Sequence, residues 1–348
     1  MLFARPMTPR HHTDLTVPHE TARQAAIHTP WPAAHELWEE DIDPAREEFA
    51  RFLALVSAPG RDGKPLPITV YAATAEAEAD ARRRAGHLAR IIREPYGDVW
   101  ARDTGPVFTL GPDGLTAVRF KFNGWGGKYD LPGDQTFGAR IAREAGATIL
   151  QADFICEGGA LEFDGEGTLI TTRQCVLNTN RNPRLSQSDF EARMEALFGV
   201  TKVIWLEEGL LGDHTDGHVD NLARFAGPGR VVCQVPAGPG DPNAKILDRI
   251  ARDLDRAVDA RGRRLEVLRI VSPGRVEVDA GEAAAASHMN WVVGPRHVVL
   301  PAYNDRAVLA ARSLQRAFPG RKVVPSGSSA ILTGGGSFHC VTCNQPAG

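Results

Sequence analysis

A cysteine in a glycine-rich setting near the C-terminus is the clearest chemical signal in this chain. Cys340 follows residues 334–339, whose sequence is Gly-Gly-Gly-Ser-Phe-His. Glycines adopt backbone angles closed to other residues and let backbone amides come close to a reacting group. A cysteine held in such a polar turn as its thiolate attacks electrophiles. The sequence therefore predicts a nucleophilic cysteine at position 340.

A second signal is the run Gly-Asp-His-Thr-Asp-Gly-His-Val-Asp-Asn over residues 212–221. His218 and Asp220 are two positions apart, so in an extended segment their side chains face the same side. Histidine moves protons near neutral pH, which suits it to acid–base catalysis. Two other interpretations stay open: a loop whose aspartates only stabilise turns, and a metal site of His214, His218 and Asp220. The glycines and Thr215 disfavour the helix that would bring both histidines to one face.

Further carboxylates stand beside glycines or aromatic residues. Asp103 lies in the stretch Val-Trp-Ala-Arg-Asp-Thr-Gly-Pro over residues 99–106, and Glu157 directly precedes two glycines. An aspartate before a turn is commonplace, so the Asp103 motif is weak when taken alone. A second tryptophan, Trp125, lies in the glycine-rich segment 122–130.

Taken together, the motifs pair one candidate nucleophile and one histidine with the carboxylates of Asp103, Glu157, Asp216 and Asp220. This acidic set favours a cationic substrate. A carboxylate accepts two parallel N–H bonds from a planar guanidinium group. Two such carboxylates would hold the central carbon of a guanidinium in place for attack by sulfur. Trp100 and Trp125 could wall an aliphatic or cationic stem.

The cysteines allow one further interpretation. Cys340 and Cys343 form a Cys-x-x-Cys pattern, which is typical of redox proteins when it opens a helix after an early strand. Here the pattern lies near the chain end and precedes Pro346, so a redox role is the less favoured alternative. Five cysteines in 348 residues indicate reduced thiols rather than a disulfide scaffold.

Helical and strand-like patterns alternate along the chain, which predicts an α/β fold. Asp43-Pro44 and Asp241-Pro242 each predict a helix start, and the apolar stripe after the first is Phe49, Leu53 and Val56. Other helices are expected over residues 75–93, 136–146, 186–199 and 304–318. Strands are expected over residues 68–72, 116–122, 168–172, 203–206, 230–235, 265–271 and 291–300. Helices recur roughly every 50 to 60 residues, which indicates repeated strand–helix units around a centre.

The bulk composition is that of a globular protein with a substantial core. Hydrophobic residues make up 43% of the chain and charged residues 24%. The net charge of −3 offers no basic face for nucleic acid, and the arginines of residues 82–84 fit a solvated helix face. The N-terminus lacks the apolar core of a signal peptide, and no long apolar run predicts a membrane span. We therefore expect a cytoplasmic protein that binds neither nucleic acid nor membrane.

Nothing in the composition divides the chain into several domains. We expect a flexible N-terminal arm over residues 1–18 and a single catalytic domain over residues 19–348. The turn-rich segment 236–240 is short enough to be an ordinary loop.

The motifs resemble those of the agmatine deiminases, a family within the guanidine-modifying superfamily. The matching segments occur in the family's order and at similar separations: residues 100–106, 122–130, 157–159, 177–183, 217–221 and 334–340. The resemblance implies the pentein fold, a five-bladed α/β propeller with fivefold pseudosymmetry. It also implies a homo-oligomer, a dimer or higher, and no metal or organic cofactor.

The resemblance implies a role for each motif. Cys340 would be the nucleophile and His218 the acid and base. Asp103 and Asp220 would clamp the guanidinium group, and Glu157 would orient His218. The substrate channel would be lined by Trp100, Trp125, Asp216 and the backbone of Gly336.

The implied reaction is the hydrolysis of agmatine to N-carbamoylputrescine and ammonia, an early step toward putrescine. Cys340 would add to the guanidinium carbon, and His218 would protonate the departing nitrogen. A water deprotonated by His218 would then release the product from a covalent thiouronium intermediate.

Three positions depart from the family's pattern. Residues 22–29 differ where the family has a tryptophan before its Trp-Pro pair, here Trp31-Pro32, and Ala101 replaces a bulkier residue. Cys343 stands where the family commonly has glutamine, which adds a thiol that could form a disulfide with Cys340. The alternatives to agmatine turnover are deimination of another guanidino substrate, such as peptidyl-arginine, and non-catalytic binding of polyamines or guanidines.

Overall fold

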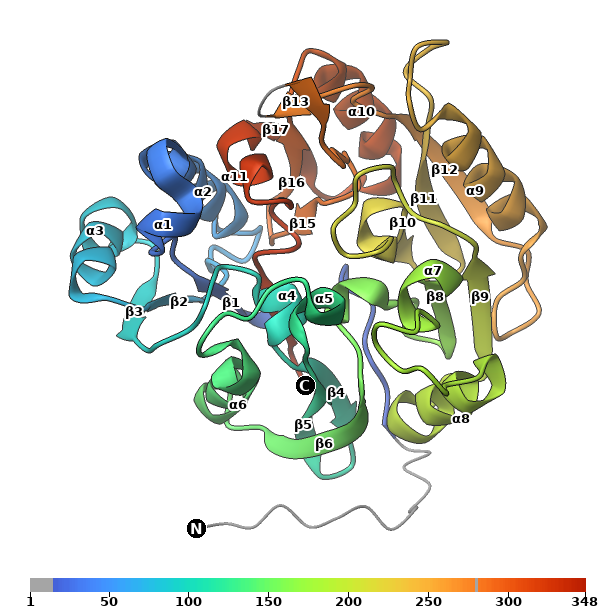
Figure 1. The fold of residues 1–348 in the computed structure, drawn as a ribbon, viewed down its shortest axis with the longest axis horizontal. Helices are drawn as coiled ribbons and strands as arrows, with labels where there is room; N and C mark the ends of the chain where they lie inside the picture. The colour runs from blue at the N-terminus through green and yellow to red at the C-terminus, as the bar shows by residue number, and fades with distance from the viewer. Residues whose placement is uncertain (1–14, 279–280) are drawn as a thin grey trace.

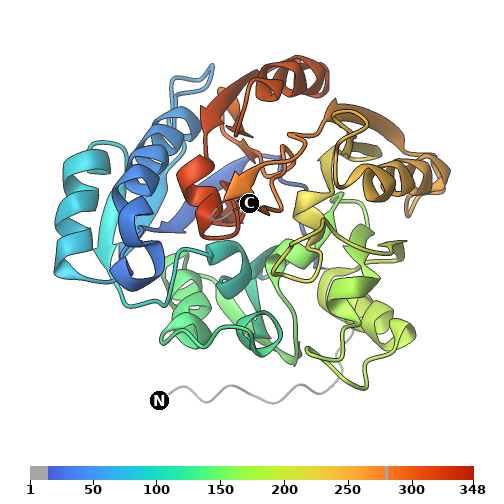
Figure 2. The same cartoon turned by 45° about the horizontal axis from the view of Figure 1, so that its top comes forward.

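Five small sheets follow one another around a common centre (Figure 1). The computed structural model describes residues 15–278 and 281–348. Within these residues a separate hairpin, β13 (Glu277–Val278) and β14 (Glu282–Ala283), stands apart from the five sheets. The longer helices lie toward the outside of the ring, as the tilted view also shows (Figure 2). The centre is therefore enclosed by sheets.

Four of the sheets repeat one topology. An antiparallel pair comes first, and a helix then leads to a third strand that runs parallel to the second. A parallel pair needs such a crossover connection, which explains why helices alternate with strands. The strands are β4 (Val107–Gly111), β5 (Gly114–Lys121), β6 (Thr148–Ile155), β7 (Glu162–Phe163), β8 (Thr168–Thr172), β9 (Lys202–Leu206), β10 (Ala223–Gly227), β11 (Arg230–Val235), β12 (Glu266–Val271), β15 (Val292–Val293), β16 (His297–Ala302) and β17 (Lys322–Gly327). The crossover helices are α6 (Asp134–Glu144), α8 (Gln187–Phe198), α9 (Ala244–Arg256) and α10 (Arg306–Leu314), the last extended by η5 (Gln315–Ala317).

The remaining sheet joins the two ends of the chain. Its strands lie in the order β18 (Cys343–Pro346), β1 (Gln24–Pro30), β2 (Ile68–Ala72) and β3 (Arg90–Arg93). Strand β1 pairs antiparallel with β18, where His28 faces Cys343, and parallel with β2. Its helices are α1 (His35–Trp38), η1 (Glu39–Asp41), α2 (Ile42–Val56) and α3 (Ala75–Ala85). Because β18 begins three residues after Cys340, this pairing anchors the chain next to the candidate nucleophile.

Short helices at the ends of strands carry most of the motifs identified in the sequence. These elements are α4 (Ala101–Thr104), α5 (Gly124–Gly127), η2 (Gly158–Ala160), α7 (Arg173–Val176), η3 (Val219–Asn221) and α11 (Ser329–Thr333). Connecting segments held on a rigid scaffold commonly carry functional residues.

The expected α/β alternation is confirmed, and the apolar stripe of α2 is fully buried at Phe49, Leu53 and Val56. Helix α8 begins at a capping box, in which Ser186 accepts from the backbone N–H of Asp189. It ends before Gly199, whose φ of 66° is a left-handed conformation that glycine adopts without strain.

Some expected boundaries are wrong. The helix expected over residues 75–93 ends at Ala85, and residues 90–93 form the short strand β3. The strand expected over residues 291–300 is a hairpin, because Gly294 and Pro295 turn the chain between β15 and β16. Helix α9 begins at Ala244 and not directly after Asp241, where a start was expected. The Asp241 side chain instead accepts a hydrogen bond from the backbone N–H of Asn243, the residue before the helix.

The expected N-terminal arm lies mostly outside the described residues, which begin at residue 15. Of its last residues, Leu15 is buried, and Thr16 exchanges two backbone hydrogen bonds with Leu110 of β4 at 2.8 and 2.9 Å. Residues 15–18 therefore lie against the first strands of the second sheet. The division into an arm and a single domain stays a prediction.

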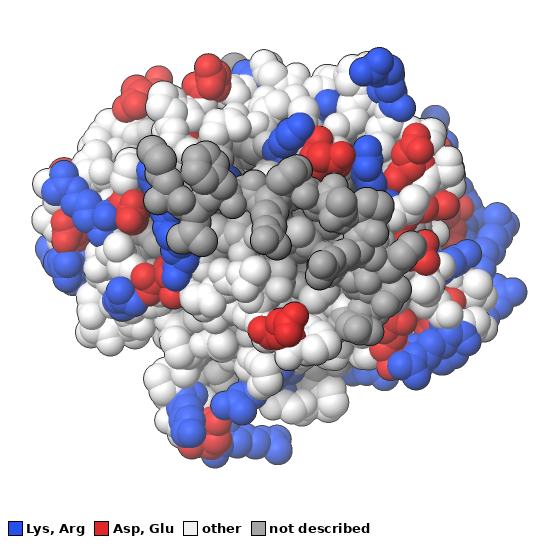
Figure 3. Space-filling view, turned by 90° about the horizontal axis from the view of Figure 1, so that it is seen from below, with Lys and Arg blue, Asp and Glu red and all other residues white. Residues whose placement is uncertain are grey.

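Charged side chains of both signs are mixed on the surface. Seen from below, lysines and arginines lie among acidic residues around the described part of that face (Figure 3). Arg82, Arg83 and Arg84 on α3 form ion pairs with acidic residues on the same helix. None of the helices within residues 15–278 and 281–348 is long and apolar enough to cross a membrane.

Candidate active site

The motifs that the sequence singled out converge around Cys340. Its Sγ lies 3.6 Å from Oδ2 of Asp220, and its side chain is buried. The Cys340 carbonyl oxygen accepts a 3.0 Å hydrogen bond from the backbone N–H of Arg102, which joins the nucleophile to the segment of Asp103. The backbone N–H of Cys340 donates to Oδ1 of Asn290 at 3.1 Å. The thiol is thus held between three segments that are far apart in the sequence.

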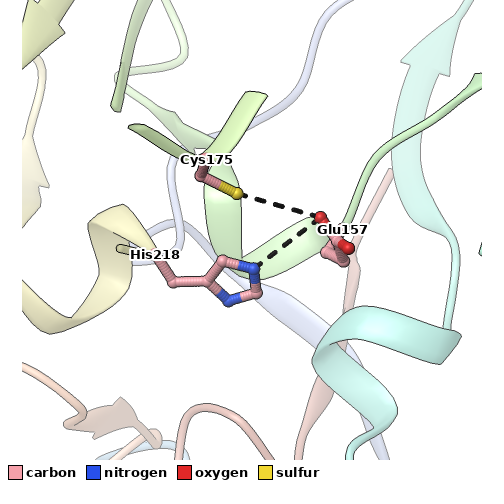
Figure 4. A group of neighbouring side chains, drawn as sticks. All are labelled: Glu157, Cys175 and His218. Atoms are coloured by element: carbon pink, nitrogen blue, oxygen red, sulfur yellow. Dashed lines mark hydrogen bonds and ion pairs between the residues drawn. The ribbon is translucent and has the colours of Figure 1, made fainter. Parts of the chain in front are cut away.

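His218 is buried between two carboxylates. Its Nδ1 lies 3.6 Å from Oδ1 of Asp103, and its Nε2 lies 3.8 Å from Oε2 of Glu157. Figure 4 shows the imidazole ring turned toward Glu157, which also faces the Cys175 thiol, with its Sγ 3.9 Å from the carboxylate. Burial by itself would lower the pKa of His218. The negative charge of Asp103, and then the nearby Cys175 and Glu157, outweigh burial and raise that pKa well above its ordinary value. The surroundings of His218 therefore favour its protonated form.

The two candidate clamps are fixed differently. Asp103 accepts from the backbone N–H of Gly159 at 3.0 Å and from Nε1 of Trp125 at 2.9 Å. Oδ2 of Asp220 accepts from Nδ1 of His339 at 2.7 Å, whereas its Oδ1 is buried with no hydrogen-bond partner among the described residues. Burial raises the pKa of Asp103. In Asp220 the bond and charge of His339 outweigh burial and lower the pKa.

The chemistry of the thiol follows from its neighbours. Burial, and then the negative charges of Asp220 and Asp103, raise the pKa of Cys340 well above the ordinary value. The thiol therefore stays neutral near pH 7 until a positive charge comes between these groups. A cation that pairs with the aspartates would favour the thiolate at the moment it binds.

A cavity of about 200 Å³ opens beside Cys340. Its wall includes Trp38 and Trp100, whose rings stack at 6.2 Å between centroids. The remaining lining residues are Leu37, Asp98, Asp103, Trp125, Tyr129, Leu131, His214, Thr215, Thr333, Gly334, Gly335 and Cys340. Gly336 lies behind this wall, where an added Cβ would come within 2.6 Å of Trp100 and 3.2 Å of the Cys340 Sγ. Only a glycine at position 336 lets the tryptophan and the thiol lie this close.

Comparison with known proteins assigns this arrangement to a family. A model of the Porphyromonas-type peptidyl-arginine deiminase family matches residues 16–346. The chain belongs to this family.

Individual relatives agree with the family assignment. Proteins named agmatine deiminase from Pseudomonas aeruginosa (strain LESB58) and Stutzerimonas stutzeri (strain A1501) are 36% and 35% identical to the chain. The alignments cover 91% of both proteins in the first case and 95% of both in the second. The solved structure of the Enterococcus faecalis agmatine deiminase superposes with a TM-score of 0.90 at 26% identity, over 99% of each chain. The fold is therefore the pentein propeller that the resemblance implied.

Most of the expected site residues come together in this family member. Cys340, His218, Asp220, Asp103 and Glu157 form one contiguous cluster, and Trp100 and Trp125 line the adjoining cavity. Asp216 accepts from Nζ of Lys128 at 2.7 Å and from Nδ2 of Asn180 at 2.9 Å, and it pairs with Arg181. These partners occupy both of its oxygens, so Asp216 ties loops together behind His214 and Thr215, which line the cavity.

The alternative metal set of His214, His218 and Asp220 is not assembled. His214 instead contacts Tyr129, whose hydroxyl lies 3.0 Å from Nδ1 at the cavity wall. Among the described residues, the group of potential ligand atoms is that of Glu157, Cys175 and His218, which lie within 4.8 Å of one another. Oε1 of Glu157 is already bonded to Arg181.

Several residues of the site had no signal strong enough to find them in the sequence. Arg181 lies in the family segment 177–183, which does not by itself indicate a buried ion pair, Asn290 lies in a segment of unremarkable composition, and Glu20 lies near the expected arm. His339 was visible only as the neighbour of Cys340. Their roles arise from buried contacts across the centre of the ring, which no local periodicity reveals.

Arg181 provides a test of the buried charges. Its side chain is fully buried, and it donates to Oε1 of Glu157 at 3.0 Å and to the Thr215 carbonyl oxygen at 2.9 Å. Replacing Arg181 with methionine should lower the free energy of unfolding by about 3–5 kcal/mol, because the buried Glu157 carboxylate would lose the guanidinium that pairs with it. Urea unfolding measures this difference.

The matched control is Arg249→Met on α9, which breaks an exposed ion pair with Glu208. It should cost less than about 1 kcal/mol. Equal losses in the two variants would contradict the role given to Arg181.

Proposed function

We propose that the chain is an agmatine deiminase that hydrolyses agmatine to N-carbamoylputrescine and ammonia through a covalent Cys340 intermediate. The observation that carries the proposal is the position of the Cys340 thiol. It lies 3.6 Å from one candidate clamp, Asp220, in a cavity that the other, Asp103, also lines, while His218 is 3.6 Å from Asp103. This set can hold a planar cation, attack its central carbon and supply a proton to the leaving nitrogen. The relatives named agmatine deiminase support the same substrate.

The cavity favours agmatine over free arginine. None of the residues that line it, all within the described part of the chain, is a lysine or an arginine. The α-carboxylate of arginine would therefore find no cationic partner there. The amine of agmatine would meet aromatic faces and the carboxylate of Asp98, whose Oδ1 also accepts a hydrogen bond from Nε1 of Trp38 at 2.9 Å. Burial raises the pKa of Asp98 to about 6, so this group is still mostly ionised at neutral pH and can pair with an ammonium.

The proposed reaction proceeds in two halves. As the cationic guanidinium binds, the thiol loses its proton to solvent, and the thiolate sulfur bonds to the guanidinium carbon. His218 gives its proton to one terminal nitrogen, the C–N bond breaks, and ammonia leaves a thiouronium. Neutral His218 then takes a proton from water, and the hydroxide adds to the carbon. The C–S bond breaks as the new hydroxyl group becomes the ureido carbonyl and loses its proton to solvent. The products are the ureido compound and the thiolate of Cys340.

A panel of substrates tests the proposal. Purified protein supplied with agmatine, free arginine or a blocked arginine peptide is assayed for ammonia and for the ureido product. We expect agmatine to have the highest kcat/KM. Faster turnover of the peptide would make the chain a peptidyl-arginine deiminase. Binding of agmatine by calorimetry without turnover would make it a binding protein.

The pH dependence of alkylation tests the electrostatics of the thiol. Since burial and two carboxylates raise the pKa of Cys340, its alkylation by neutral iodoacetamide should rise with pH to a midpoint above the ordinary cysteine value of about 8.5. Asp220→Asn should lower that midpoint, because it removes a negative charge 3.6 Å from the sulfur. Mass spectrometry of the Cys340 peptide measures both rates. An unchanged midpoint would exclude Asp220 as a cause of the shift.

Three properties stay predictions from the sequence. We propose a homo-oligomer, which light scattering after gel filtration would test. We also propose that the product feeds putrescine synthesis and that the protein acts in the cytoplasm. Cell fractionation and the putrescine content of a strain that lacks the gene would test these two points.

A further inference from the structure

A buried chain of hydrogen bonds connects the N-terminal segment to one of the two clamps. Nδ1 of His339 lies 2.7 Å from Oδ2 of Asp220. On the other side of the ring, Nε2 lies 2.9 and 3.1 Å from the two carboxylate oxygens of Glu20. His339 and Asp220 are each only 1% exposed, whereas the Glu20 side chain is 17% exposed, so the bond to Asp220 is the better shielded from solvent. One imidazole thus joins two carboxylates that are 200 residues apart in sequence.

The charge of this chain follows from its acceptors. In Glu20 the charges of Arg102, His339 and Arg224 outweigh burial and hold the pKa well below its ordinary value. In Asp220 the hydrogen bond to His339 outweighs burial and lowers the pKa of the carboxyl group. An ionised carboxylate only accepts hydrogen bonds, and His339 is the ring that lies within hydrogen-bond distance of both carboxylates.

The two carboxylate oxygens of Asp220 consequently differ in their hydrogen-bond partners. His339 holds Oδ2, which lies toward the Cys340 sulfur. Oδ1 is buried and has no partner among the described residues, and a buried acceptor left unpaired is costly. A guanidinium N–H would satisfy it. Fixing one oxygen thereby determines where the free oxygen points.

We propose that Glu20 and His339 are positioning residues that fix the Asp220 carboxylate so that its free oxygen faces the substrate cation. The inference rests on the proposed function in that it takes Asp220 as a guanidinium clamp. It adds the N-terminal segment to the parts of the chain that position the candidate active site, because Glu20 orients His339 and His339 orients Asp220. Glu20 is in turn held by Arg102, at 2.8 Å, and by Arg224.

The test compares two reagents for the same thiol. Chloroacetamidine is a planar cation that needs the clamp, whereas iodoacetamide is neutral and does not. The ratio of the alkylation rate by chloroacetamidine to that by iodoacetamide at Cys340 measures how much the clamp favours a cation. This measurement does not require substrate turnover. General loosening of the fold would change both rates together. His339→Asn keeps a donor near Asp220 but loses the bond to Glu20, while Glu20→Gln keeps the shape of Glu20 and loses its charge.

The expected result is a lower ratio in both variants. In His339→Asn it should fall about 10- to 100-fold, the range for one charge-assisted hydrogen bond, and in Glu20→Gln about tenfold. The matched control is Glu162→Gln, which also removes a partner of Arg224, at 2.8 Å, but one that makes no hydrogen bond to His339. Its ratio should fall by less than that of Glu20→Gln, because Glu162 does not bond to His339.

The pH profile of the ratio gives a second readout. Asp220 is approached by His218 and Asp103, by Arg224 of β10, and by His339 and Cys340 of the C-terminal segment. Since His339 lowers the pKa of Asp220, the preference for the cation should persist to low pH in the unmodified protein. Without His339, protonation of Asp220 should abolish the preference at a higher pH.

Three outcomes would overturn the inference. They are a folded His339→Asn protein with an unchanged ratio and pH profile, an equal loss in Glu162→Gln and Glu20→Gln, and no preference for the cation in the unmodified protein. Should His339→Asn fail to fold by circular dichroism, Glu20→Gln decides. A normal cation preference without agmatine hydrolysis would defeat the proposed function and leave this inference standing.

Discussion

Serine in place of Cys340 should abolish the release of ammonia from agmatine. The hydroxyl is close in size to the thiol, but it is far less acidic and a weaker nucleophile, so the covalent intermediate should not form. Loss of a nucleophile in covalent catalysis costs roughly 10⁴-fold or more in kcat. Because Asp103 and Asp220 remain, agmatine should still bind, which calorimetry on the Cys340→Ser protein would measure.

The control is Cys343→Ser. Cys343 is buried, and its Sγ lies 3.3 Å from the Pro106 carbonyl oxygen, whereas the Cys340 Sγ lies beside Asp220. Turnover should therefore survive in the control. Full activity of Cys340→Ser would eliminate it as the nucleophile, and equal loss in both variants would revive a role for the Cys-x-x-Cys pair.

Alanine in place of Gly159 should have the second largest effect on activity. An added Cβ would lie 2.5 Å from Nδ1 of His218 and 2.8 Å from Oδ1 of Asp103, so one or both side chains must move. Gly159 also donates its backbone N–H to Asp103. A displacement of about 1 Å in a catalytic group costs on the order of 100-fold in rate, so kcat/KM should fall at least that far.

Gly240→Ala is the matched control for this substitution. A Cβ at position 240 meets nothing within 4 Å, and its backbone angles suit alanine. Activity and the melting temperature should both stay near those of the unmodified protein. If Gly159→Ala retained normal kcat/KM, His218 and Asp103 would not need the spacing that the structure gives them.

The sequence predicts the candidate catalytic and clamping residues better than the residues that hold them in place. Cys340, His218 and Asp103 stand beside glycines and aromatic residues whose patterns mark loops at strand ends, and such loops meet at the centre of the ring. Arg181 and Glu20 form ion pairs with distant partners, which the local sequence around either residue does not predict. Asp216 stays a predicted substrate-binding residue, and the ion pairs with Lys128 and Arg181 are contacts that its acidic motif did not predict.

The errors in secondary structure have local causes. Alanine and arginine favour helix, so the pattern that begins at residue 75 continues past Ala85 with no strong stop before the short strand β3. In segment 291–300 a Gly-Pro pair inside an apolar run turns the chain, and the β-rich residues on both sides hide this turn. In the first case β3 pairs with β2, which lies about 20 residues earlier in the chain. In the second case β15 pairs with β16 across the Gly-Pro turn.

The pairing of β1 with β18 links assembly of the molecule to its reactivity. The residues of the site range from Glu20, just before β1, to His339, just before β18. They come together around the sulfur only when these two strands have paired. During refolding, resistance of Cys340 to neutral alkylating agents should therefore appear together with closure of the propeller and not before. Intermediates that lack this closure would carry an exposed, ordinary thiol, open to oxidation.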